Sequence, residues 1–470
     1  MAGDRHLGDL ALVLHSHMPY VEGFGTYPFG EEWLFDAILR SYHPVTEVAD
    51  RLTMTVTPVL ADQLEAPGVA ERLREFGRTY RLEACEADAA DVEPAFAGAC
   101  LAEAERYRAA LARIDELGGD LLEVFRRLSQ RANVELIGSA ATHAVLPLLA
   151  TLPGRRLQVD AGLRSHRRRF GPSAGLWLPE CAYEPGLEAL LAERDLGYFC
   201  VDQSAYDEPL AALAPVSTTA GPVALAIDWE AIAWLWSLDG YPSAPVYADF
   251  HRKTMRGARP WSIGGEPYDP DAGITKAREQ AAEFIEGAAA RLQRFRAERG
   301  RLGLLTFAID TELLGHWWWE GPTWLAEVLR LAPLRGLEPV TLSEAVARHS
   351  PEARPLRAST WGEDKDFRTW DSPAVADLAW AARRLELRLL RALGEGLEEG
   401  AAHRAARELL AVQASDWAFL DMRRQASDYA YQRATDHGRA LLDAIHSGAP
   451  TEPRLRSLAP DLSLAPLLEP

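Results

Sequence analysis

The chain has 470 residues, 48% of them hydrophobic, 9% aromatic and 25% charged, which suits several domains or one large α/β barrel with additions and argues against general disorder. Its 50 Lys and Arg residues against 69 Asp and Glu residues give a net charge of −19. A surface with this charge repels nucleic acid and anionic membranes, so we expect neither as a partner, and a neutral ligand fits better.

The composition is typical of a cytoplasmic protein. The polar N-terminus is followed by an apolar run, Leu10–Leu14, that is too short for a secretory signal, and no stretch approaches the length of a membrane span. The four cysteines lie far apart and form no CxxC pair, as expected of reduced thiols. They are Cys85, Cys100, Cys181 and Cys200.

Short apolar runs that alternate with helical patterns indicate parallel βαβ units. The runs predicted as strands are Leu10–Leu14, Met54–Leu60, Val134–Ile137, Leu176–Leu178, Tyr198–Val201, Val223–Ile227 and Leu304–Ile309. Amphipathic helices are predicted over Leu101–Gln130 and Ala277–Arg299. We therefore predict an α/β fold in which residues 1–60 and 131–350 form an incomplete barrel and 61–130 a helical insertion. A doubly wound sheet is the alternative.

After Pro351 the pattern changes. The segments 373–413 and 416–445 are rich in Ala, Leu, Arg and Glu at helical period, with no strand pattern between them. This predicts an α-helical C-terminal domain over 351–446. The proline-containing tail, 447–470, is expected to extend over the surface.

Polar side chains follow four of the predicted strands. His15 and His17 follow the first strand, and His143 lies shortly after the third. Glu180 and Asp310 come at the ends of the fourth and the last predicted strand. Because the carboxyl ends of parallel strands meet at one rim, we expect these side chains to converge there.

A pair of strand-end carboxylates near many aromatic residues favours glycosidic-bond chemistry. One acid, Glu180 or Asp310, would protonate the leaving oxygen while the other supports an oxocarbenium-like transition state. A separation of about 5–5.5 Å would indicate a retaining mechanism, and a wider one inversion. The alternatives are a solvated strand-end acid for Glu180 and a helix N-cap for Asp310.

The histidines allow a different explanation. His15, His17 and His143 could join Asp310 in a metal site, which would favour a metal-dependent hydrolase or deacetylase. The alternative is that each histidine is hydrogen-bonded beside the site. Because three tryptophans follow His316, we expect that residue to have a structural or substrate-contacting role.

Tryptophan is abundant, with 14 residues, many of them clustered. Most buried tryptophans belong to a hydrophobic core, which is the alternative here. However, the segment from Trp361 to Trp370 is polar and contains glycine, which is not typical of a core helix. Indole faces stack on sugar rings, so an acidic protein with aromatic subsites suits a neutral polysaccharide.

Five segments carry a resemblance to a known family: Leu12–Val21, Gly138–Pro147, Gly175–Tyr183, Ala308–Gly321 and Gln413–Leu420. They resemble, in the same order, the motifs of glycoside hydrolase family 57, specifically of its 1,4-α-glucan branching enzymes. The resemblance runs from about residue 8 to residue 440. It implies a (β/α)7 barrel with a helical insertion and a helical C-terminal domain.

The resemblance also implies roles. Glu180 would be the nucleophile and Asp310 the acid/base, with no metal or organic cofactor. The enzyme would cleave an α-1,4 bond of glycogen, amylose or a similar α-glucan, hold the chain on Glu180 and transfer it to a 6-hydroxyl. The implied substrate-binding residues are His15, His17, Trp33, His143, Trp177, Trp261, His316, Trp361, Trp370, Asp416 and Trp417.

Two segments depart from the family. Its branching members carry a loop with a gating tyrosine, whereas the stretch 202–216 is shorter and Tyr206 is its one gate candidate. Asp228-Trp-Glu230 replaces an expected Asp-Pro-Glu. A shortened gate would admit water and favour hydrolysis. The alternatives are therefore an α-1,4-glucan hydrolase or 4-α-glucanotransferase with little branching and, in another class, a non-catalytic glucan-binding protein.

Overall fold

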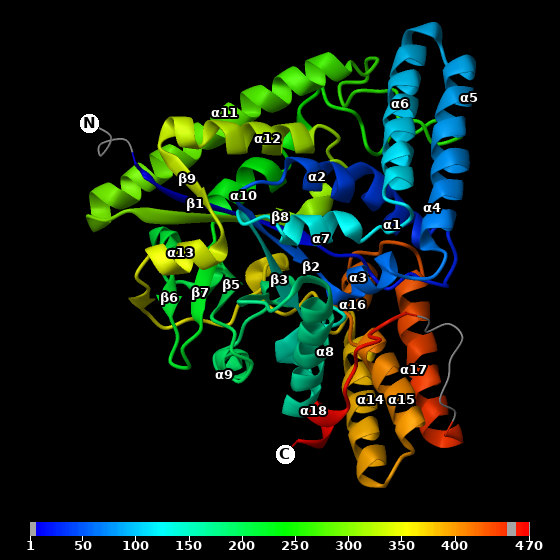
Figure 1. Cartoon of the computed structure of the whole chain (residues 1–470), viewed down its shortest axis with the longest axis vertical. Helices are drawn as coiled ribbons and strands as arrows, with labels where there is room; N and C mark the ends of the chain where they lie inside the picture. Colours follow the sequence, from blue (N-terminus) through cyan, green and yellow to red (C-terminus); the bar gives the residue numbers. More distant parts are fainter. Residues whose placement is uncertain (1–5, 449–456, 470) are drawn as a thin grey trace.

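The structure is a computed structural model that describes residues 6–448 and 457–469 (Figure 1). One mixed sheet contains the strands β1 (Gly8–Ser16), β2 (Leu52–Val56), β3 (Val134–Ser139), β4 (Gly175–Trp177), β5 (Tyr198–Asp202), β6 (Val216–Ser217), β7 (Val223–Ile227), β8 (Gly303–Asp310), β9 (Leu337–Val340) and β10 (Glu352–Ala353). Every residue of β1, β2 and β5 is buried, and the continuous apolar run Leu10–Leu14 of β1 is typical of a strand buried on both faces. In β2 the alternating Thr53 and Thr55 are buried as well.

Seven parallel strands form the incomplete barrel, in the order β7-β5-β4-β3-β2-β1-β8. A doubly wound sheet would reverse direction at a switch point, and this order does not, so the predicted barrel is confirmed. In the described part of the chain no β-ladder joins β7 to β8. The N–H of Asp228, just after β7, instead donates to the Thr306 carbonyl of β8 at 2.8 Å.

The helices that come before the C-terminal region in the sequence surround the sheet. Those before residue 350 are α1 (Glu31–Ala37), α2 (His43–Val48), α3 (Pro58–Leu64), α4 (Val69–Phe76), α5 (Glu83–Asp91), α6 (Pro94–Glu116), α7 (Glu123–Ser129), α8 (Leu152–Phe170), α9 (Leu187–Ala192), α10 (Trp229–Trp236), α11 (Pro270–Arg299), α12 (Gly321–Leu331) and α13 (Leu342–Arg348). In Figure 1, α4, α5 and α6 stand together at the upper right, at the opposite end of the molecule from the C-terminal helices. No helix in the described ranges is long and apolar enough to cross a membrane.

The C-terminal helices form the orange and red group at the lower right of Figure 1. They are α14 (Ala376–Gly394), α15 (Glu399–Val412), α16 (Ser415–Met422), α17 (Tyr429–Ser447) and α18 (Ala465–Leu468). The helical character predicted for this region is confirmed. Each long predicted segment is two helices, however, and the first break contains Gly396 at a φ of 88°, a conformation that glycine adopts readily.

Other predicted elements need correction. The run Met54–Leu60 leaves the strand at Val56, because Pro58 opens helix α3. The helix predicted over Leu101–Gln130 is the two helices α6 and α7, separated by a turn that contains Gly118 and Gly119, both at positive φ. Three strands, β6, β9 and β10, were not predicted, because they have only two to four residues and β9 contains a proline.

The tail predicted as extended is packed where the structure describes it. Residues 449–456 and 470 lie outside the described residues. Leu458 and Leu467 are buried with residues of α8, α15 and α17, and Ala465–Leu468 forms the short helix α18 beside α8. The tail therefore adds apolar contacts to the C-terminal helices instead of only lying over the surface.

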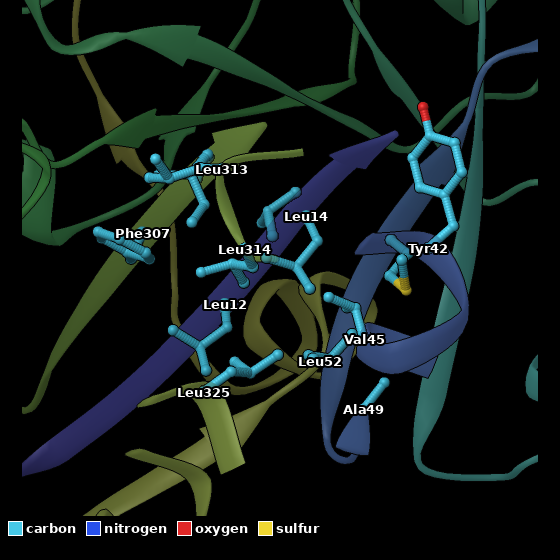
Figure 2. Packing of buried hydrophobic residues seen from close by; sticks show 14 of the residues in the cluster. Leu12, Leu14, Tyr42, Val45, Ala49, Leu52, Phe307, Leu313, Leu314 and Leu325 are labelled. Carbon is cyan, nitrogen blue, oxygen red and sulfur yellow. The ribbon is translucent and has the colours of Figure 1, made fainter. Parts of the chain in front are cut away.

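The main hydrophobic core lies between β1 and the helices that cover it. Figure 2 shows Leu12 and Leu14 of β1 beside Leu314 and Leu325, and all four side chains are nearly or completely buried. Tyr42 stands at the edge of this cluster with its hydroxyl pointing away from the apolar side chains. The core thus supports the carboxyl end of β1, and the Tyr42 hydroxyl at its edge points out of the apolar cluster.

The close packing of α8 on β3 gives a stability prediction. A Cβ atom at Gly162 would lie 2.1 Å from the Ser139 carbonyl oxygen, so Gly162→Ala should lower the free energy of unfolding by about 1–3 kcal/mol in urea titrations. The matched change Gly98→Ala, in α6 with open space around it, should raise the free energy by about 0.5–1 kcal/mol. Equal effects of the two substitutions would contradict this packing.

Candidate active site

A cavity of about 1000 Å³ opens at the carboxyl ends of the barrel strands and extends to the C-terminal helices. Its size suits a ligand larger than one sugar ring. Ten of the predicted site residues line it: His15, His17, Trp33, His143, Glu180, Asp310, His316, Trp361, Trp370 and Asp416. Five of these residues, His15, His17, His143, Glu180 and Asp310, were expected from their places at strand ends, and the family resemblance implied the others.

Glu180 lies in a tight turn directly after β4. Its φ of 60° is in the left-handed region, which is unusual for a residue with a side chain and is found at functional sites. Its backbone carbonyl accepts from the Trp361 N–H at 2.9 Å. One carboxylate oxygen accepts from Trp361 Nε1 and the other from Ser415 Oγ, both at 2.7 Å.

These donors decide the charge of Glu180. Burial acts to raise the pKa of its carboxyl, but interactions with His143, Trp361 and Ser415 outweigh burial and lower the pKa. Hydrogen bonds that stabilise the charged form have this effect. Glu180 is therefore a carboxylate.

Asp310 ends β8 and has the opposite surroundings. Burial raises the pKa of Asp310 well above its ordinary value, and the nearby Glu312 and Glu180 carboxyls raise it further. Burial also raises the pKa of Glu312 to about 7, although Glu312 accepts hydrogen bonds from the Tyr42 hydroxyl and from the His17 N–H. Asp310 is therefore the carboxyl that keeps a proton.

Two imidazoles connect the strands that carry the carboxyls. The β1–β8 register pairs His15 with Asp310. His15 Nε2 lies 3.0 Å from His143 Nε2, and His143 Nδ1 lies 3.5 Å from a Glu180 oxygen. Burial lowers the pKa of both histidines, and the neighbouring imidazoles lower it further, so both rings are neutral at pH 7.

His17 differs from its neighbours. Burial acts to lower its pKa, but the Asp416 carboxylate, 2.9 Å from His17 Nε2, outweighs burial and raises the pKa. The ring stacks on His143 with centroids 4.1 Å apart. In residues 6–448 and 457–469, no three His, Cys, Asp or Glu side chains are grouped so that they could hold a metal ion.

Aromatic side chains form much of the cavity wall. Exposed Trp236 and Trp317 make an edge-to-face pair with centroids 6.1 Å apart, and both line the cavity although neither was predicted as a site residue. His316 packs on Phe250 with centroids 5.3 Å apart, and burial lowers its pKa to about 3. Indole and phenyl faces of this kind can stack on sugar rings.

Four predicted site residues lie outside the cavity lining, namely Trp177, Tyr206, Trp261 and Trp417. The Trp177 ring is fully buried and stacks on His15 with centroids 4.8 Å apart, so it supports the site from behind. The Trp261 ring packs between Phe96 and the Arg252 guanidinium. Trp417 is a core residue whose Nε1–H donates to the Ala411 carbonyl at 2.7 Å.

The prediction of Tyr206 as a gate is wrong. Its ring is buried in the cluster beneath β5 and β7, and its hydroxyl donates to the Ala224 carbonyl at 3.1 Å. No residue of the stretch 202–216 is part of the cavity lining. The shorter stretch therefore packs in the core and does not lie over the site.

Some functional contacts were not found in the sequence. Ser415 and Glu312 lie within segments that resemble family motifs, and that position was the available signal. Tyr42 and Thr55 carried no signal, since one is in the π-helical turn Ile38–Tyr42 and the other is within β2.

Comparisons with known proteins identify the family of the chain. Residues 11–356 match the family described as glycosyl hydrolase family 57, and residues 378–468 match the C-terminal region described as that of 1,4-alpha-glucan branching enzyme. The 1,4-alpha-glucan branching enzyme of Thermococcus kodakarensis is 32% identical over 92% of this chain and 72% of its own length.

Solved structures are similar over nearly the whole chain. The branching enzyme of Pyrococcus horikoshii superposes with a TM-score of 0.91 at 29% identity, covering 98% of this chain and 97% of the other. The alpha-amylase AmyC of Thermotoga maritima gives 0.86 at 26% identity, covering 98% and 99%.

The raised pKa of Glu312 gives a pH prediction. A carboxyl with a raised pKa binds its proton more tightly in the folded chain, so its contribution to stability falls as the pH rises from about 4.5 to about 7. Glu312→Gln has no such proton to lose. Its free energy of unfolding relative to the unmodified chain should therefore rise by about 1–3 kcal/mol across that range.

Urea unfolding at several pH values measures this difference. The control Glu116→Gln, at the exposed end of α6, should differ from the unmodified chain by less than about 0.5 kcal/mol at every pH. A Glu312→Gln difference that stays flat or falls with pH would show that Glu312 is ionised throughout.

Proposed function

The chain belongs to glycosyl hydrolase family 57, and we propose that it is a 1,4-α-glucan branching enzyme with a retaining mechanism. The observation that carries the proposal is the pair of carboxyl groups in one cavity, one held as a carboxylate and the other held protonated. A general acid and an ionised partner carboxylate require these two states, and the retaining mechanism, in which the carboxylate is the nucleophile, follows from the resemblance to the family.

In the proposed mechanism Glu180 attacks the anomeric carbon of an α-1,4-linked glucose while Asp310 donates its proton to the leaving oxygen. The glucan chain is then covalently attached to Glu180. Asp310, now ionised, accepts the proton of an acceptor 6-hydroxyl, which attacks the anomeric carbon and releases Glu180. An α-1,6 branch forms, and both groups return to their starting states.

The proposed substrate is an α-glucan such as glycogen or amylose, and the proposed role is in glycogen biosynthesis. The cavity volume and its aromatic wall support a polymeric neutral sugar. The four cysteines are buried and free, which supports a cytoplasmic location. The net charge of −19 disfavours nucleic acid as a partner.

A second candidate is α-1,4-glucan hydrolysis or 4-α-glucan transfer by the same two carboxyls. The structural similarity to the alpha-amylase AmyC favours this candidate. The match of residues 378–468 to the branching-enzyme C-terminal region favours branching. A glucan-binding protein without activity would not need a carboxyl with a raised pKa, Asp310, in the same cavity as a carboxylate, Glu180.

Substitution of each carboxyl tests the proposal. Glu180→Gln removes the nucleophile and Asp310→Asn the acid, so each should lower kcat on amylose by about 10²–10⁴-fold or more. Proton NMR of the products should show new α-1,6 anomeric signals with the unmodified enzyme and none with either variant.

The control is Glu116→Gln, which should keep full activity. If either carboxyl variant keeps full activity, the assigned roles are wrong. If the unmodified enzyme shortens amylose without producing α-1,6 signals, the second candidate replaces branching.

A further inference from the structure

A continuous row of hydrogen-bonding groups crosses the site along the cavity wall, which includes His15, His143 and Glu180. Thr55 Oγ1 lies 2.6 Å from His15 Nδ1, and His15 Nε2 lies 3.0 Å from His143 Nε2. His143 Nδ1 lies 2.9 Å from Ser415 Oγ, which lies 2.7 Å from a Glu180 oxygen. The row therefore joins β2, β1, the loop after β3, the start of α16 and the turn after β4.

The Glu180 carboxylate, at the end of the row, determines which group donates and which accepts in every hydrogen bond of the row. A carboxylate only accepts, so the Ser415 hydroxyl must donate its one proton to Glu180. His143 Nδ1 must then carry a proton and donate it to Ser415, which leaves Nε2 of a neutral His143 as an acceptor. That acceptor takes the Nε2–H of His15, whose bare Nδ1 accepts from the Thr55 hydroxyl.

We propose that Ser415 is a positioning residue, the link through which a one-way chain of hydrogen bonds, from Thr55 through His15 and His143, holds the carboxylate of Glu180. The assignment of Glu180 as the nucleophile rests on the proposed function, whereas the direction of the chain rests on the geometry. Each donor in such a chain polarises the next, which strengthens the last hydrogen bond.

Backbone conformation supports this role for Ser415. Glu180 and His143 both lie in the left-handed region, at φ values of 60° and 58°, and such strain persists only where the surroundings hold it. Ser415 contacts both side chains, and its own N–H donates to the His143 carbonyl at 3.2 Å. The neighbouring Ala144 and Ala414 form an antiparallel bridge. The start of α16 is thus fixed to the loop that carries His143.

The neighbouring charges are compatible with neutral histidines. The titratable groups that face Glu180 come from β8, with Asp310, from the end of β1, with His17, and from the loop after β3, with His143. The raised pKa of His17 favours a positive charge on its ring, and the Asp416 carboxylate pairs with this charge. His143 can therefore remain neutral beside it. The chain can therefore stay neutral between Thr55 and the Glu180 carboxylate.

The first experiment reads the tautomers directly. In the protein labelled with ¹⁵N at its histidines, and assigned with His15→Gln and His143→Gln variants, ring ¹⁵N shifts should show protonated Nδ1 with bare Nε2 for His143. His15 should show the reverse. The opposite tautomer at either ring, or a doubly protonated His143 at pH 7, would overturn the chain whether or not the protein forms branches.

The second experiment removes the link. Ser415→Ala removes one donor to Glu180 and the nearest acceptor of the His143 Nδ1–H, which then faces only the Glu180 oxygen at 3.5 Å. We therefore expect kcat on amylose to fall about 10- to 100-fold while KM changes little. The His143 ¹⁵N shifts should change in the same variant. Ser415→Thr keeps the hydroxyl and should restore both readouts.

The matched control is Ser173→Ala. Ser173 also accepts one hydrogen bond, from the Gly138 N–H, and donates another, to the Gly175 carbonyl, but it lies at the start of β4, away from the cavity. Its loss should leave kcat and the tautomers unchanged. If Ser415→Ala keeps normal kcat and normal ¹⁵N shifts, Ser415 has no positioning role. If the Ser415→Ala variant does not fold, Thr55→Val is used instead, because it removes the hydroxyl that donates to His15 Nδ1. The His15 ring ¹⁵N shifts should then change, and unchanged shifts would overturn the proposal.

Discussion

The site depends on two buried carboxyl groups in one cavity whose surroundings shift their pKa values in opposite directions. Burial raises the pKa of both, because a low dielectric disfavours charge. Glu180 remains ionised because Trp361 and Ser415 donate to its two oxygens. Asp310 instead faces the carboxyl groups of Glu312 and Glu180, which disfavour its ionisation further. The fold creates this contrast by placing Glu180 against the C-terminal segments and Asp310 beside β1.

The barrel could be predicted because strands such as β1 and β8 are buried on both faces and read as mostly apolar runs. The wrong predictions have two causes, which are single residues that interrupt a longer pattern and pairing with a distant segment. Pro58 ends a run that continues to look like a strand, and Gly118 and Gly396 break segments of unbroken helical period. β9 exists because β1 offers a partner at Gly8–Ala11, and no local pattern records that pairing.

The site was predictable where a residue's place along a strand decides its position in space. Glu180 and Asp310 are of this kind. Ser415 is not, because it is 235 positions from Glu180 and reaches it only through the docking of α16. Tyr206 shows the complementary failure, since a segment's length and composition do not tell which way a side chain points. Motif resemblance supplied part of what local patterns lacked.

The position of α16 has a consequence for synthesis of the protein. Both carboxyls are translated by residue 310, but the groups that Ser415 and Asp416 supply to Glu180 and His17 come from a helix made more than a hundred residues later. Since N-terminal regions emerge and begin to fold first, a nascent chain passes through a stage with a formed barrel and an unfinished catalytic centre. The contacts of Ser415 with Glu180 and of Asp416 with His17 therefore form late in translation, when the helices beyond residue 413 dock.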